Sequence, residues 1–140
     1  MFKEWFVDSR ERRRLKAALA PEIRAVLSQI VYLTNVQEKL VADIQKTGDI
    51  GKLFVQFRGN YNVVFAAAAD RLGLLHFALI EDLVTFHYQV QHVLESFEIA
   101  TKEDANAQFH DELLRTLREA RDLGCSLVDR LEDASLSTGD

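Results

Sequence analysis

The sequence predicts an all-α protein, an antiparallel bundle of about four helices, and three observations lead to that expectation. Apolar residues recur at alternating spacings of four and three over two long stretches, residues 19–44 and 79–97. No stretch sustains the alternation of apolar and polar residues that a half-buried strand shows. A chain of 140 residues is one domain's worth and can bury a core without disulfides. Helices with such stripes are expected to pack against each other.

The first long helix is predicted from the apolar seam of residues 19–44, in which Gln37 takes one apolar position. Pro21 lacks the backbone N–H that a helix interior needs. Either the helix begins at Pro21, or a preceding helix joins it there at a kink, which is the preferred interpretation. Gly48 and Gly51 are expected to end this helix.

Residues 52–58 are predicted to form a short extended aromatic link, because they are rich in aromatic and β-branched residues and have no helical period. Phe54, Phe57 and Tyr61 form a dense apolar patch beside glycines, and such a patch often binds a partner strand or helix. These three residues are therefore candidates for binding a partner protein. A lid folded over one end of the bundle is the alternative.

Three further helices are predicted after this link. Asn60 can cap a helix over residues 61–72, and Gly73 is expected to end it in the left-handed conformation. The next helix begins near His76 and keeps an unbroken apolar seam as far as residue 97. The last helix covers residues 109–131.

The first sixteen residues are predicted to form a separate head, in which aromatic residues are followed by basic ones. This order is typical of a chain that touches an anionic membrane surface or has just left a bilayer. A solvated helix end is the alternative. Residues 17–133 then form the bundle domain, and residues 134–140 a frayed acidic tail. The candidates for binding the membrane or another anion are Phe2, Trp5, Phe6, Arg10, Arg12, Arg13, Arg14 and Lys16.

The formal net charge of −5 is divided unevenly along the chain. Residues 1–24 contain seven Lys or Arg and four Asp or Glu, whereas residues 101–140 contain five and ten. An acidic body argues against general binding of nucleic acid. The longest apolar run has seven residues, far from the roughly twenty that span a bilayer. No secretory signal is evident, and we expect a cytoplasmic protein at the inner face of the membrane.

The stretch YNVVFAAAADRLGLL at residues 61–75, followed by DLVTFHY at residues 82–88, resembles a pattern of small uncharacterised bacterial helical proteins. In those proteins an N-terminal membrane-spanning helix and a basic linker precede a helical body. The similarity covers about 80 residues, from Leu15 to Phe97. It implies a helical fold near a membrane and no catalytic residue, since that family has no assigned activity. This chain lacks the spanning helix, so it either rests on the membrane or begins after the span.

One pair of residues fits a nuclease. Arg71 and His76 have the R-x4-6-H spacing of the metal-independent ribonucleases of the HEPN class, in which the arginine would hold phosphate and the histidine act as acid or base. Two features depart from that class. Leu72 stands where a polar residue is usual, and Gly73 predicts a helix break between the pair.

No cofactor and no metal site is predicted. His87 and His92 lie about 140° apart around a helix and cannot bind one ion together. No Glu-x-x-His pair, nucleotide-binding loop or serine-hydrolase motif occurs. The single cysteine, Cys125, fits a half-buried packing position in a reducing compartment.

The preferred interpretation is a non-enzymatic interaction module that attaches peripherally to the membrane through its head and binds a protein partner. A small ribonuclease that uses Arg71 and His76, and a soluble regulatory binding protein, are the alternatives. The heptad seams also suit a homodimer, because pairing within and between chains uses the same spacing.

Overall fold

A computed structural model describes residues 2–48, 62–102 and 105–133, apart from the side chains of residues 2–8 and 101–102. The described residues contain no strand, which confirms the all-α prediction. The predicted extended link at residues 52–58 and the tail at residues 134–140 lie outside the described residues. Along the chain the elements are α1 (Phe2–Thr47), α2 (Val63–Ala67), the 3-10 helix η1 (Ala69–Leu74), α3 (Phe77–Lys102) and α4 (Ala107–Glu132).

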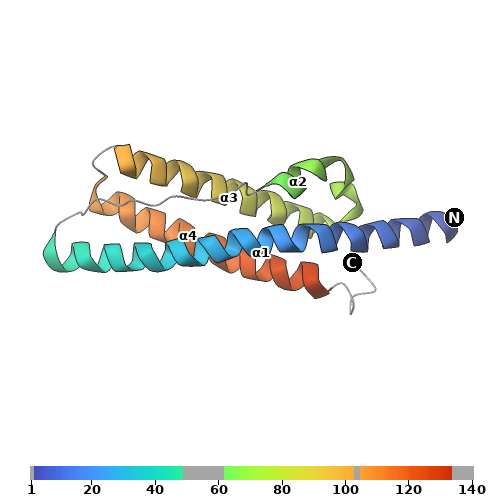
Figure 1. The fold of residues 1–140 in the computed structure, drawn as a ribbon, viewed down its shortest axis with the longest axis horizontal. Helices are drawn as coiled ribbons and strands as arrows, with labels where there is room; N and C mark the ends of the chain where they lie inside the picture. Colours follow the sequence, from blue (N-terminus) through green and yellow to red (C-terminus); the bar gives the residue numbers. More distant parts are fainter. Residues whose placement is uncertain (1, 49–61, 103–104, 134–140) are drawn as a thin grey trace.

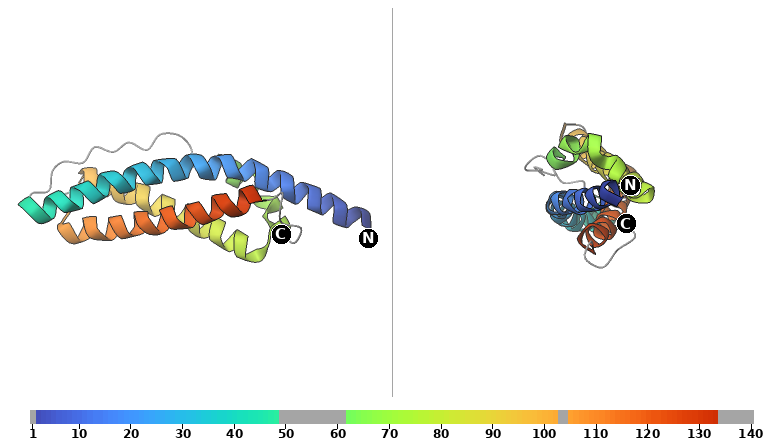
Figure 2. Two further views of the ribbon diagram at one scale, coloured as in Figure 1. Left: turned by 90° about the horizontal axis from the view of Figure 1, so that it is seen from below. Right: turned by 90° about the vertical axis from the view of Figure 1, so that its right-hand side faces the viewer.

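Three long helices, α1, α3 and α4, lie side by side and make the body of the protein (Figure 1). The helix α4 runs antiparallel to both α1 and α3, so α1 and α3 point in the same direction. The short α2 and η1 form a small lobe beside α1, close to the start of α3. The N-terminal end of α1 extends past this lobe and past the end of α4, as Figure 1 and the left view of Figure 2 show.

The helix α1 continues through Pro21 without a sharp break (Figure 2). The alternative that the helix begins at Pro21 is therefore wrong, and the residues before it extend the same helix. The proline costs one internal hydrogen bond, which a helix 46 residues long can lose because packing stabilises it on both sides of Pro21. Gly48 ends α1 as predicted, with a φ of 70° and an N–H that donates to the Ile44 carbonyl at 2.8 Å.

The core lies between the three long helices and contains the predicted seams. Phe86 is its largest fully buried side chain, and α3 contributes one continuous buried face. The predicted periodicity is thus confirmed in all three long helices. The seam residues found buried are Leu19, Ile23, Val26, Ile30 and Leu33 in α1, Leu79, Leu83, Phe86, Val90, Val93 and Phe97 in α3, and Leu113, Leu117, Ala120, Leu127 and Leu131 in α4.

Gly124 marks a close approach of the three long helices. A Cβ atom at this position would lie 2.9 Å from Cδ1 of Leu27 on α1 and 3.1 Å from Cε2 of Phe86 on α3. The next residue, Cys125, is exposed, so its predicted half-burial is wrong. The reason is helical geometry: with Gly124 facing the core, its successor turns by about 100° toward solvent.

A buried polar contact joins α1 to α4 at the one polar position of the α1 seam. The Nε2 atom of Gln37 donates to the His110 carbonyl at 3.0 Å and lies 3.0 Å from Nδ1 of the same residue. Since the amide NH₂ has two donors, both His110 atoms act as acceptors, which assigns the imidazole proton to Nε2. Burial lowers the pKa of His110 below its ordinary value of 6.5, although the charge of Asp111 opposes the shift.

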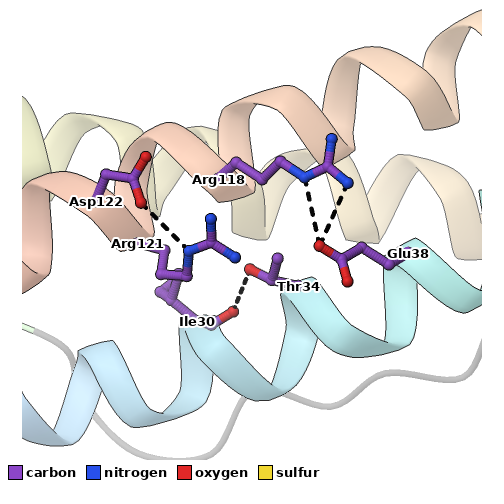
Figure 3. A network of polar contacts seen from close by, with 6 residues as sticks. All are labelled: Ile30, Thr34, Glu38, Arg118, Arg121 and Asp122. Atoms are coloured by element: carbon purple, nitrogen blue, oxygen red, sulfur yellow. Dashed lines mark hydrogen bonds and ion pairs between the residues drawn. The ribbon is translucent and has the colours of Figure 1, made fainter.

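Among the described residues, two ion pairs join α1 to α4, and Figure 3 shows the one between Arg118 and Glu38. Both Nε and Nη2 of Arg118 donate to the Glu38 carboxylate, at 3.4 and 3.3 Å. Arg24 pairs with Glu132 at the C-terminal end of α4. These pairs are largely exposed, and each contributes at most about 1 kcal/mol.

The lobe differs from the helix predicted over residues 61–72. An α-helical turn in α2 is followed by the 3-10 helix η1, and Asn60 lies outside the described residues. No residue of α2 or η1 is fully buried, so packing gives a longer α-helix little support here. The left-handed conformation expected at Gly73 is also absent, because η1 continues through it, and Gly48 is the one described glycine with a positive φ.

Candidate functional site

The N-terminal part of α1 presents three arginines to solvent. The side chains of Arg10, Arg13 and Arg14 are exposed, and no hydrogen bond or ion pair joins them to other described residues. The bundle does not need these three charges for its own packing. The surface they form is called the arginine tip below.

Two further basic candidates of the predicted head, Arg12 and Lys16, belong to the fold. The Nε atom of Arg12 donates to the Leu74 carbonyl at 2.7 Å and thereby holds the end of η1 against α1. Lys16 is 2% exposed and Leu15 is equally buried. Arg12 therefore anchors the lobe, Leu15 and Lys16 belong to the packed part of α1, and the exposed part of the head ends at Arg14.

The side chains of the predicted aromatic candidates all lie outside the described residues. Phe2, Trp5 and Phe6 are carried by the helical backbone of α1, but their side chains lie outside the described residues. The predicted partner-binding residues Phe54, Phe57 and Tyr61 lie outside the described residues altogether. The arginine tip is thus the described part of the predicted membrane site.

A buried polar cluster that the sequence analysis did not single out joins α1, α2 and α3. The Glu22 carboxylate accepts hydrogen bonds from the backbone N–H groups of Val64 at 2.6 Å and Phe65 at 3.1 Å. Both N–H groups belong to the first turn of α2, whose N-cap residue Asn62 makes no side-chain cap hydrogen bond. Glu22 therefore caps a helix from 42 residues away, and it ties the lobe to α1.

His87 of α3 completes this cluster. Its Nδ1–H donates to the Leu83 carbonyl at 2.8 Å, and its ring stacks on Phe65 with centroids 3.9 Å apart. Its Nε2 atom is buried, has no hydrogen-bond partner among the described residues, and lies 4.0 Å from Oε1 of Glu22. Burial lowers the pKa of His87 below 6.5 and outweighs the opposing effects of the Leu83 hydrogen bond and the Glu22 charge.

The sequence held one signal for this cluster. Glu22 lies three residues after Leu19 and four before Val26, which places it on the buried face of α1. A carboxylate there needs donors, because an unpaired buried charge is expensive. Nothing in the sequence indicated that those donors would be backbone N–H groups of a distant short helix.

The ribonuclease candidates are both exposed. Arg71 lies on η1, and His76 precedes α3, where its Nδ1 accepts a hydrogen bond of 3.3 Å from the Ala78 N–H. His76 thus helps to cap α3. No hydrogen bond or ring contact joins Arg71 to His76 among the described residues, so the structure gives no support to a paired acid–base role.

The part of the chain that the structure describes contains neither a metal site nor a membrane-spanning helix. No group of three or more His, Cys, Asp or Glu residues is arranged there to hold a metal ion. No helix described is both long and apolar enough to cross a membrane. The arginine tip and the Glu22–His87 cluster are therefore the features on which a functional argument can rest.

Comparison of the chain with protein-family models, with curated proteins and with solved structures finds no match. The resemblance to small bacterial proteins with a spanning helix thus stays an expectation. Function has to be argued from the residues, the geometry and the surface chemistry of this chain.

Proposed function

We propose that the protein is a non-enzymatic helical interaction module that attaches peripherally to an anionic membrane surface through the N-terminal end of α1 and binds a protein partner with its bundle. The observation that carries this proposal is the arginine tip. Arg10, Arg13 and Arg14 are exposed in the N-terminal part of α1, next to the end of the helix that projects beyond the bundle. A basic helix end with aromatic residues before it suits the headgroup region of an anionic leaflet.

The expected strength of this attachment is modest. Three arginines contribute roughly 1 kcal/mol each near an anionic leaflet, and partial burial of the three aromatic residues adds a similar amount. A total on the order of 4–6 kcal/mol corresponds to a dissociation constant between about 1 mM and tens of micromolar. Stable residence at the membrane then needs a second contact, which a membrane-bound protein partner would supply.

The charges on the bundle favour attachment by its end. The helix α4 exposes several carboxylates along its length, including those of Asp111, Glu119 and Asp129. An anionic leaflet repels these groups, so the bundle would stand away from the surface while the arginine tip contacts it. In this orientation the sides of the bundle stay accessible to a protein partner.

The test is flotation of the full chain with vesicles, made either of phosphatidylcholine alone or with added phosphatidylserine, at low and high salt. One variant carries Arg10→Glu, Arg13→Glu and Arg14→Glu. A matched control carries Lys39→Glu, Lys46→Glu and Arg115→Glu, which change the net charge equally at exposed positions of the bundle. A deletion of residues 1–16 is a poorer test, because it also removes the buried Leu15 and Lys16.

The proposal predicts that the chain and its control float only with anionic vesicles at low salt, and that the triple arginine variant does not. Flotation with neutral vesicles, or equal losses in both variants, would contradict it. If no vesicle binds and the chain instead binds RNA in a salt-sensitive manner through the same arginines, the soluble regulatory alternative is favoured.

A further inference from the structure

The outer face of α3 exposes a row of large apolar side chains. Phe77 and Tyr88 are each 74% exposed, and Val84 and Ile99 are about half exposed. At 3.6 residues per turn these four positions lie within about 60° of one another around the helix axis. They form one stripe, called the α3 outer stripe below, that runs along most of the helix.

No described helix covers this stripe. The buried residues of α3, such as Leu83, Phe86 and Val90, lie on the opposite side of the helix, about 180° away. A surface helix of a monomer usually has one apolar face and one polar face. The helix α3 has two apolar faces, and packing within the chain explains only one of them.

Acidic residues interrupt the stripe at two symmetrical places. Glu81 lies seven residues before Tyr88 and Glu95 seven residues after it, both inside the same arc of the helix. Both side chains are exposed. Between Phe77 and Ala100 there is no Lys or Arg. Apart from the exposed His92, which lies about 40° from Tyr88 around the axis, the stripe is apolar and acidic, with the two carboxylates about 21 Å apart along the axis.

We propose that the α3 outer stripe binds an amphipathic helix of a partner protein, whose apolar residues cover Val84 and Tyr88 and whose basic residues, spaced about four turns apart, pair with Glu81 and Glu95. A helix laid along another helix buries residues at such spacings. The inference deepens the proposed function, because it names the surface and the chemistry of the protein partner.

Charge argues against a second copy of this chain as the occupant. The pattern of the stripe is nearly the same when read from either end of α3, with Tyr88 at its centre. In an antiparallel pair of α3 helices Glu81 would face Glu95 of the other copy, and in a parallel pair each glutamate would face itself. Both arrangements place like charges opposite each other, which disfavours them. The same charges disfavour an anionic membrane on this face.

The size of the stripe indicates a weak complex. Aromatic side chains offer about 150–250 Å² each, so the four partly exposed residues expose on the order of 450 Å². This is about half of what one partner contributes to an interface of standard size. We expect micromolar affinity for an isolated helix.

The test uses two synthetic helical peptides and the full chain, with binding followed by fluorescence anisotropy at low salt. The first peptide repeats the stripe with leucine at the apolar positions and lysine at the two acidic ones. Since the pattern reads alike in both directions, the peptide fits in either orientation. The second peptide has glutamate in place of each lysine. Two variants of the chain are compared, Glu81→Lys with Glu95→Lys, and the control Glu119→Lys with Asp129→Lys on exposed positions of α4.

The inference predicts that the lysine peptide binds the chain and the α4 control at least about tenfold more tightly than the glutamate peptide does, and that the α3 variant reverses this preference. Binding of neither peptide, or a preference that the α3 variant leaves unchanged, overturns the inference. A dimer of the chain that Tyr88→Glu abolishes in sedimentation also overturns it, because a second copy is then the occupant. Flotation with vesicles depends on the arginines and not on Glu81 or Glu95, so failure here is distinguishable from failure of membrane attachment.

Discussion

The Nε2 atom of His87 lies 4.0 Å from Oε1 of Glu22 in a cluster that joins the lobe to the bundle, and it is buried with no hydrogen-bond partner among the described residues. The Nδ1–H donates to the Leu83 carbonyl, so the lone pair of the neutral imidazole at Nε2 faces the carboxylate. Protonation would turn this neutral contact into an ion pair, but burial makes the charged imidazole costly. The folded protein therefore favours neutral His87.

The first prediction concerns pH. Since the pKa of His87 is lower in the folded protein than in the unfolded chain, the unfolded chain binds more protons at mildly acidic pH. The free energy of unfolding contributed by neutral His87 is fully present well above pH 6.5 and is lost as the pH falls through 6.5 toward the folded pKa. The slope is at most about 1.4 kcal/mol per pH unit for one group. Urea unfolding at pH 7.5 and 5.5 measures it.

His87→Gln is expected to reduce this pH dependence, and His110→Gln to reduce it in the same direction, because burial lowers the pKa of His110 as well. His92→Gln, at an exposed position of α3, serves as the control. A pH dependence that neither of the first two variants changes would show that other groups cause it.

The second prediction concerns the cap that Glu22 provides for α2. Glu22→Ala leaves the Val64 and Phe65 N–H groups without their acceptor and is expected to lower the free energy of unfolding by about 1–3 kcal/mol. Amide exchange should accelerate in the lobe more than in α4. Glu11→Ala, at an exposed position of the same helix, is the control. Equal exchange rates in the two variants would argue against the cap.

The third prediction concerns Gly124, where helix propensity and packing act in opposite directions. Alanine is favoured over glycine in a helix interior by about 1 kcal/mol, but the added Cβ meets Leu27 and the fully buried ring of Phe86. Because Phe86 has no exposed side to move into, we expect overpacking to prevail, with a net loss of about 1 kcal/mol for Gly124→Ala and more for Gly124→Val. Thermal unfolding measures both, and a higher melting temperature for Gly124→Ala would contradict this view of the packing.

The fourth prediction concerns Gln37 and His110. Gln37→Leu leaves the His110 acceptors buried without their donor and should cost about 1–3 kcal/mol of unfolding free energy. His110→Leu likewise leaves the Gln37 amide without one of its two acceptors. The double variant should cost less than the sum of the two, since its side chains leave fewer polar atoms unpaired. Strict additivity in a double-mutant cycle would mean that the contact contributes no coupling.

The sequence predicted the parts of this fold that depend on periodicity. The apolar seams located α1, α3 and α4, and Gly48 ended α1 as expected. The lobe was not predicted, since a short α2 depends on Glu22 from a distant helix rather than on its own residues. The basic block was visible in the sequence, but only packing separates the exposed Arg13 from Arg12, which binds the Leu74 carbonyl. Local sequence patterns do not predict hydrogen bonds between residues that are 42 or 62 positions apart, as these are.

The exposure of the α3 outer stripe could not be predicted from the sequence either. The seam of α3 that contains Leu83 and Phe86 is buried, as predicted. Val84 was expected to widen this core face, which is wrong, because it is 51% exposed and lies with Tyr88 on a second apolar face. The exposed fractions of these residues identify that face, because a pattern of apolar residues alone does not say which of them a neighbour covers.

The central claim is that the N-terminal end of α1 contacts an anionic membrane, and the emission of Trp5 tests it most directly. Trp5 is the one tryptophan of the chain and lies in the predicted head, so its fluorescence reports on that end alone. On addition of phosphatidylserine vesicles the account predicts a blue shift of the emission and quenching by brominated lipid, both reversed by high salt and absent after Arg10→Glu, Arg13→Glu and Arg14→Glu. Emission that stays unchanged with anionic vesicles at low salt would contradict the account.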